Sequence, residues 1–129
     1  MTSDPYMYST PPTMTPGQEK TWAVIAHGAA LAAMVLSAGL LGFIGSLVVY
    51  LMYKDRGPFV RAHAANSLNI QITMALWLVA SIPLILLLGL GLLTMWLAPF
   101  VAGALHIIGM VKASSGEWWE PPLTPGFVR

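Results

Sequence analysis

The stretch KDRGPFVRAHAANSLNIQIT (Lys54–Thr73) decides how the chain is organised. It contains half of the six Lys and Arg residues, and long sequences without formal charge lie on both sides of it. A polar segment between two long apolar segments is typical of a water-facing connection in a membrane protein. The other segments can therefore be placed by working outward from this connection.

The composition indicates an integral membrane protein. Of the 129 residues, 57% are hydrophobic and 9% are charged, whereas an average soluble domain has about 25% charged residues. The mean hydropathy is +0.72, so the lipid bilayer is the expected partner. A net charge of +1 gives no reason to expect nucleic acid. Cysteine is absent, which excludes disulfides, thiolate metal sites and cysteine catalysis.

Toward the N-terminus, Trp22–Tyr53 contains no Asp, Glu, Lys or Arg. One straight helix of this length would measure about 48 Å, more than the ~30 Å hydrocarbon core. Three glycines between residues 37 and 45 weaken a helix. We therefore expect the stretch of residues 21–53 to be bent into two short helices, with one long tilted helix as the alternative. Residues 1–20 are rich in proline and are predicted to be a disordered tail.

Toward the C-terminus, the pattern predicts two further spans. Residues 54–65 form a basic loop and the amphipathic start of a helix, because Gly57-Pro58 suits a helix start. Residues 66–88 and 92–112 are the second and third spans, joined by a turn at Leu88–Gly91. Residues 113–129 form an interfacial C-terminal tail. The expected fold is an all-α polytopic helical bundle with a single membrane domain over residues 21–129.

The cations predict the orientation. The turn at Leu88–Gly91 has no charge, so the positive-inside rule places the basic loop and the C-terminus in the cytoplasm. We expect a multi-pass protein of the bacterial plasma membrane. The basic and aromatic residues expected at the interface are Lys54, Arg56, Arg61, His63, Trp118 and Trp119.

Two histidines, His27 and His106, lie within apolar spans, where an ionisable side chain raises a functional hypothesis. An imidazole that hydrogen-bonds across a helix interface is the favoured interpretation. If the N-terminus lies outside, the two side chains occupy opposite leaflets and cannot share one ion. His63 lies beside Arg61, where a solvated or headgroup-contacting role is expected.

A polar cluster occupies the start of the second span: Asn66, Asn69, Gln71 and Thr73. Amides in a membrane helix are costly unless they find partners. They can hold a helix bundle together, which is the favoured reading, or line a cavity. Small residues at Ala38, Gly42 and Ser46, and others along the third span, would allow another helix to approach closely.

A resemblance extends from Trp22 to Arg129. Ala26-His27, Lys54-Asp55, Pro58–His63, Leu68–Ile72 and Gly116–Trp118 occur in an order that resembles a family of small bacterial membrane proteins. Their domain of unknown function is grouped with the twenty-kilodalton subunit of the Tic translocon, the import machinery of the chloroplast inner envelope. The resemblance implies four membrane helices, both termini on one side and, at most, a role in protein translocation.

No motif for catalysis is present, and no cofactor or metal site is predicted. We expect a non-enzymatic helical bundle that associates with itself or with a larger membrane complex, in assembly or translocation. The first alternative is a small-solute or ion pathway lined by His27, His106 and the amides of the second span. The second is a haem- or metal-binding subunit.

Overall fold

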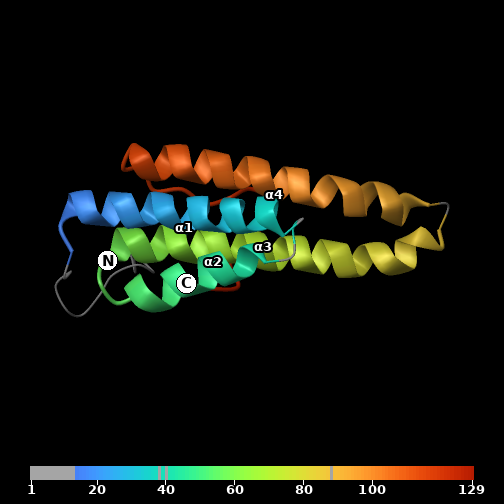
Figure 1. Ribbon diagram of the computed structural model, residues 1–129, viewed down its shortest axis with the longest axis horizontal. Helices are drawn as coiled ribbons and strands as arrows, with labels where there is room; N and C mark the ends of the chain where they lie inside the picture. The colour runs from blue at the N-terminus through green and yellow to red at the C-terminus, as the bar shows by residue number, and fades with distance from the viewer. Residues whose placement is uncertain (1–13, 38, 40, 88) are drawn as a thin grey trace, which may run out of the picture.

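The computed structural model describes residues 14–129 except 38, 40 and 88. Within this part of the chain there are four α-helices and no strand: α1 (Pro16–Leu36), α2 (Gly42–Tyr53), α3 (Pro58–Ile85) and α4 (Leu90–Ser114). α1 and α3 each contact the other three helices. Figure 1 shows the α1–α2 hairpin beside one part of the longer α3–α4 hairpin. The all-α class is confirmed.

Three apolar stretches were expected in the membrane, the first of them bent into two short helices, and the structure shows this only in part. Among the described residues, α3 and α4 are long and apolar enough to cross a membrane. α2 is apolar but has only 12 residues, about 18 Å at 1.5 Å per residue. α2 is therefore too short to cross the membrane by itself, unlike α3 and α4.

α1 begins inside the segment predicted to be a disordered tail. Thr15 Oγ1 accepts a hydrogen bond from Gln18 N at 3.2 Å, and Gln18 Oε1 accepts one from Thr15 N at 2.9 Å. This capping box satisfies two backbone donors, and Pro16 stands where a helix needs no N–H. The tail assignment is wrong for residues 16–20, and residues 1–13 lie outside the described part.

The break between α1 and α2 lies where the glycines predicted it. Ser37 Oγ donates to Ala33 O at 2.5 Å and accepts from Leu41 N at 2.8 Å, which ends one helix and starts the turn. Gly45 then lets the two helices meet, because a Cβ there would lie 2.8 Å from Ala29 O. The first stretch is two helices, as expected.

A carboxylate from α1 starts α3. Glu19 is buried, and its Oε2 accepts hydrogen bonds from Phe59 N at 2.8 Å and Val60 N at 3.0 Å. These are donors that α3 cannot satisfy itself, and Gly57 offers no capping side chain. A Cβ at Gly57 would lie 2.2 Å from the Glu19 carboxyl carbon. Glu19 thus ties the start of α1 to the start of α3.

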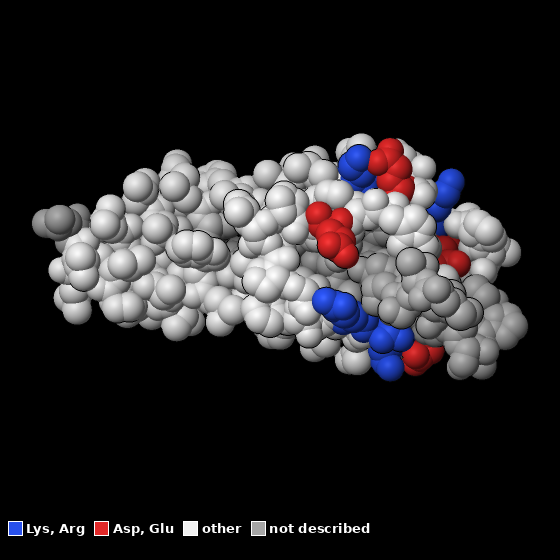
Figure 2. All heavy atoms as spheres, turned by 180° about the vertical axis from the view of Figure 1, so that it is seen from behind, with Lys and Arg blue, Asp and Glu red and all other residues white. Residues whose placement is uncertain are grey.

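The α3–α4 hairpin extends beyond the α1–α2 hairpin. Gly89 has φ 74° at the predicted turn. A Cβ on Gly39, in the α1–α2 turn, would lie 4.0 Å from Pro99 Cβ in α4. The described residues between 75 and 98 therefore continue past the tip of α1–α2, and we call them the distal half; the other described residues are the polar half. In Figure 2 the charged residues gather over one part of the molecule, and the opposite part carries none on that face.

Candidate functional site: a buried histidine chain

Three histidines from three helices meet in the polar half. His27 of α1, His63 of α3 and His106 of α4 are all fully buried. The expected exposure of His63 at the interface is wrong, because α1 and the C-terminal tail cover that side of α3. His27 and His106 are in contact rather than in opposite leaflets, because the break after Leu36 leaves α1 beside the C-terminal part of α4.

The rings form one continuous chain. His63 Nε2 lies 2.9 Å from the carbonyl oxygen of Glu117. His63 Nδ1 lies 3.3 Å from His27 Nε2, and His27 Nδ1 lies 3.3 Å from His106 Nδ1. At the other end, His106 Nε2 lies 2.6 Å from Gln71 Nε2. Every imidazole nitrogen of the three rings thus faces another polar atom.

The end at Glu117 fixes the tautomer of every ring. A carbonyl oxygen only accepts, so His63 Nε2 carries the proton and Nδ1 accepts from His27 Nε2–H. His27 Nδ1 then accepts from His106 Nδ1–H, and His106 Nε2 accepts from the Gln71 amide. The second amide hydrogen of Gln71 points to Met34 Sδ at 2.9 Å. Three neutral imidazoles satisfy the whole chain, with all donors pointing toward the tail.

The packing around the chain depends on one glycine. A Cβ at Gly109 in α4 would lie 2.4 Å from His27 Cε1, so only glycine lets the ring reach α4. Trp119 of the tail lies against His27 with ring centroids 6.1 Å apart, and Phe59 packs on His63 at 4.7 Å. The chain is thus enclosed by α4, the tail and the start of α3.

This geometry suits hydrogen bonding better than metal binding. The nitrogens point at one another in sequence and do not converge on one point. Within the described ranges, no group of three His, Cys, Asp or Glu side chains is arranged to hold a metal ion. The chain can hold three helices in one register and can relay a proton over its own length.

The predicted polar cluster separates into three parts. Asn66 Nδ2 donates to the Trp119 carbonyl, while Asn69 donates to Val128 O at 2.9 Å and accepts from Val128 N at 2.7 Å. Gln71 joins the histidine chain. Thr73 Oγ1 is buried and has no hydrogen-bond partner among the described residues. Asn66 and Asn69 therefore bind the backbone of the C-terminal tail. From the sequence this tail was expected at the interface, and these contacts were not predicted.

The other expected interfacial residues lie where the start of α1, the end of α2, the start of α3 and the end of α4 meet; we call this part, with Lys20, Lys54–Arg56, Arg61 and Lys112, the charged end. Lys54 pairs with Asp55 at 3.2 Å, and the Arg56 guanidinium lies 5.5 Å from the Tyr53 ring centroid. Arg61 donates to Arg129 O at 2.7 Å. Trp118 is half-exposed and packs on Phe59, whereas Trp119 faces inward toward His27.

Sequence reasoning missed two buried polar sites. Ser67 donates to Ala26 O at 2.8 Å and lies 2.7 Å from Ser46 Oγ, which ties α3 to both α1 and α2. Glu19 was assigned to the tail. Two features of the sequence could have indicated its role. Glu19 is an acidic residue just before the first apolar stretch, and Gly57, before α3, has no side chain to cap that helix.

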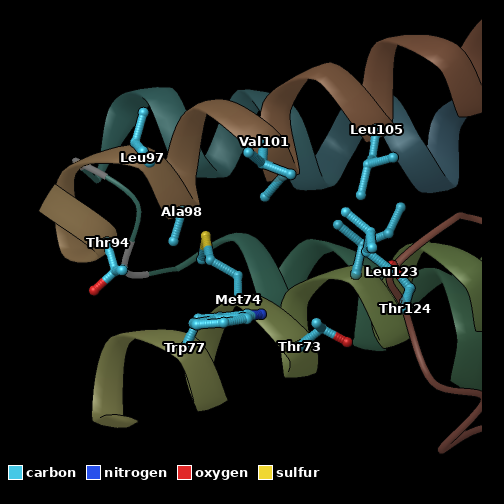
Figure 3. A pocket seen from close by; sticks show the side chains of 12 residues that line it. Thr73, Met74, Trp77, Thr94, Leu97, Ala98, Val101, Leu105, Leu123 and Thr124 are labelled. Carbon is cyan, nitrogen blue, oxygen red and sulfur yellow. The ribbon is translucent and has the colours of Figure 1, made fainter. Parts of the chain in front are cut away.

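A separate pocket lies between α3, α4 and the tail. Its volume is about 310 Å³, and Figure 3 shows Met74 and Trp77 of α3 facing Ala98 and Val101 of α4. Leu123 and Thr124 of the tail contribute to its wall. The lining is mostly apolar, and none of the three histidines belongs to it.

Comparison with known proteins gives one result. No curated protein and no solved structure matches the chain. One family model matches residues 18–128, which include nearly all of α1, the other three helices and the tail. It is not a Tic family or a domain of unknown function, so the resemblance drawn from the sequence motifs is wrong. The chain belongs to the magnetosome magnetite crystal formation protein family, MamF_MmsF.

Proposed function

We propose that this protein is a multi-pass membrane protein without enzymatic activity that acts in the formation of magnetite crystals. The observation that carries the proposal is the family match over residues 18–128, which contains the complete histidine chain. The family description names the magnetosome, so the proposed location is the magnetosome membrane in place of the plasma membrane.

The membrane arrangement is supported by length and charge. α3 and α4 have 28 and 25 residues, about 42 and 38 Å, enough for a ~30 Å hydrocarbon core. Large apolar side chains are exposed along both, including Leu76, Val79, Leu93 and Phe100. The charged end carries the cations, so the positive-inside rule puts that end, with the start of α1 and the C-terminal Arg129, in the cytoplasm.

A structural role for the histidines is favoured over catalysis or conduction. Their nitrogens are satisfied by one another, by Gln71 and by the Glu117 carbonyl. Past Gln71 lies an apolar cluster made of Met34, Ile70, Met74, Ala102 and Leu105. A polar path that meets such a cluster midway favours a scaffold over an ion pathway.

The small-residue faces that indicated self-association are used within the chain. A Cβ at Gly42 would lie 2.5 Å from Gln71 Oε1, Ser46 meets Ser67, and Gly109 admits His27. Ala102 and Ala113 are buried as well. If the protein joins a complex, the remaining surface is the apolar outside of the α3–α4 hairpin.

The experiment is complementation in a magnetite-forming bacterium from which its own genes of this family have been removed. Expression of the chain is expected to restore crystal number or size, measured by electron microscopy of whole cells. The matched control is Gly103→Ala, which lies between α4 and α1, where a Cβ would meet Leu31 Cδ1 at an ordinary 3.7 Å, and it should complement equally. Unchanged crystals despite normal amounts of the protein in the membrane would refute the role in crystal formation.

A further inference from the structure

We propose that the molecule is a wedge in the bilayer, and that its preferred partner is a lipid surface that bulges toward the charged end. The proposal rests on the proposed membrane crossing of α3 and α4. It adds that α1 and α2 enter one leaflet only, so the protein occupies more area in that leaflet than in the other.

The depth of the α1–α2 tip follows from its neighbours. The last turn of α1 contacts α3 through Met34 and Gln71, and the turn itself lies beside Pro99 of α4. Past this level, α3 continues from residue 75 to residue 85 and α4 begins at Leu90. Those last turns of α3 measure about 16 Å, close to half of the ~30 Å hydrocarbon core. The tip therefore reaches the middle of the bilayer.

The side chains at the tip are suited to hydrocarbon. Leu36 is 89% exposed and Val35 is 74% exposed, and both stand at the end of α1. The outer side of α2 is apolar along its length, with exposed Phe43, Ile44, Val48, Leu51 and Met52. If the helix tip lay in water, exposing these apolar side chains would cost free energy, whereas in the bilayer lipid tails cover them.

Three N–H groups of the described turn residues have hydrogen-bond partners within the chain. Ser37 N donates to Ala33 O at 3.0 Å and Gly39 N donates to Met34 O at 2.7 Å. Leu41 N is satisfied by the Ser37 hydroxyl. Non-helical backbone at membrane depth requires such internal partners, because lipid provides none.

The consequence is an asymmetric cross-section. Of the residues that the structure describes, those on the charged side of the midplane form four helices and the tail, and those on the far side belong only to the α3–α4 hairpin (Figure 1). Helices are about 10 Å wide, so two additional helices displace lipid in one leaflet only. A bilayer that is convex on the charged side relieves this mismatch in area.

The depth can be measured with single cysteines, because the chain contains none. In oriented vesicles, Lys54→Cys should react with a membrane-impermeant maleimide from the charged side only, and Leu87→Cys from the far side only. Leu36→Cys should react from neither side, and a fluorophore attached there should be quenched by lipids labelled near the bilayer centre. Reaction of Leu36→Cys from the far side would overturn the wedge and leave the crossing of α3 and α4 intact. Failure of Leu87→Cys to react from the far side would overturn the crossing itself.

The preference for curvature can be measured in tubes pulled from giant vesicles that contain the labelled full-length protein. With the charged end outside, the ratio of protein to lipid dye should be severalfold higher in the tube than in the flat membrane, and it should rise as the tube narrows. The same protein inserted in the opposite orientation is the matched control and should be depleted from the tube. Equal ratios in tube and flat membrane for both orientations would refute the wedge.

Discussion

The polar half and the distal half keep their helices together in different ways. In the polar half, buried polar contacts join α1 to α3 and α4, α3 to α4, and α2 to α3, through Glu19, the histidine chain and the Ser46–Ser67 pair. Among the described residues of the distal half, α3 and α4 share one polar pair, Ser81 and Thr94 at 2.5 Å, beside the close approach of Gly91 to Ser81 O. Lipid provides no hydrophobic force between helices, so polar contacts and small residues must fix their positions. The polar half therefore depends on many specific contacts, whereas in the distal half such contacts are confined to Ser81, Thr94 and Gly91, and the exposed positions tolerate change.

The largest loss of stability is expected for His27→Leu, which removes the centre of the histidine chain. Two hydrogen bonds disappear, and each leaves a buried nitrogen of His63 or His106 unsatisfied, at about 1–3 kcal/mol for each nitrogen. We expect the free energy of unfolding in detergent to fall by about 2–6 kcal/mol. Tryptophan fluorescence reports it, because Trp119 lies against His27.

The distal half supplies the control for this variant. Leu93→Ala removes an exposed side chain of α4 that lies in the distal half. Its unfolding free energy should remain within about 0.5 kcal/mol of the wild type, as for surface changes in general. If the two variants were equally stable, the histidine chain would not specify the polar half.

The next effect is expected at Gly109, where the histidine chain touches the α4 backbone. Gly109→Ala places a methyl group 2.4 Å from the His27 ring, and overpacking of this kind costs about 1–3 kcal/mol. Gly103→Ala in the same helix is the matched control, because its Cβ would meet Leu31 Cδ1 at an ordinary 3.7 Å. Alanine there should be neutral or stabilising by up to about 1 kcal/mol. Thermal unfolding of both variants in one detergent tests the difference, and equal melting temperatures would contradict it.

The sequence predicts the local features of this contrast but not the contacts between residues that are far apart in the chain. The bend after Leu36 and the turn at Gly89 follow from local glycines, and both appear where expected. Contacts such as Glu19 with α3, or Asn69 with Val128, join residues 40 or more positions apart. No local pattern encodes such a distance. The exposure predicted for His63 was wrong for the same reason. Its neighbour Arg61 indicated a solvated position, whereas α1 and the tail, which are distant in sequence, bury its side chain.

A smaller effect is expected where the tail joins the polar half. Asn69→Ala removes both hydrogen bonds to Val128, a loss of about 1–2 kcal/mol. The loss should be local, so amides of residues 117–129 should exchange with deuterium faster while those of α1 stay protected. Asn69→Asp retains the acceptor for Val128 N and should give intermediate exchange. Unchanged exchange of the tail in Asn69→Ala would show that these bonds do not hold it.

The smallest effect, of opposite sign, is expected at the pocket between α3 and α4, which is lined by one threonine of the polar half and one of the distal half (Figure 3). Thr73 Oγ1 is buried without a partner among the described residues, whereas Thr94 Oγ1 contacts Ser81 Oγ and donates to Gly91 O at 3.2 Å. Thr73→Val replaces an unsatisfied hydroxyl by a methyl group and should stabilise the protein by up to about 1 kcal/mol. Thr94→Val removes the contact with Ser81 and should destabilise it by about 0.6–1.7 kcal/mol. Chemical unfolding of the pair measures both signs under one condition. A loss of stability in Thr73→Val would mean that its hydroxyl has a partner in the membrane.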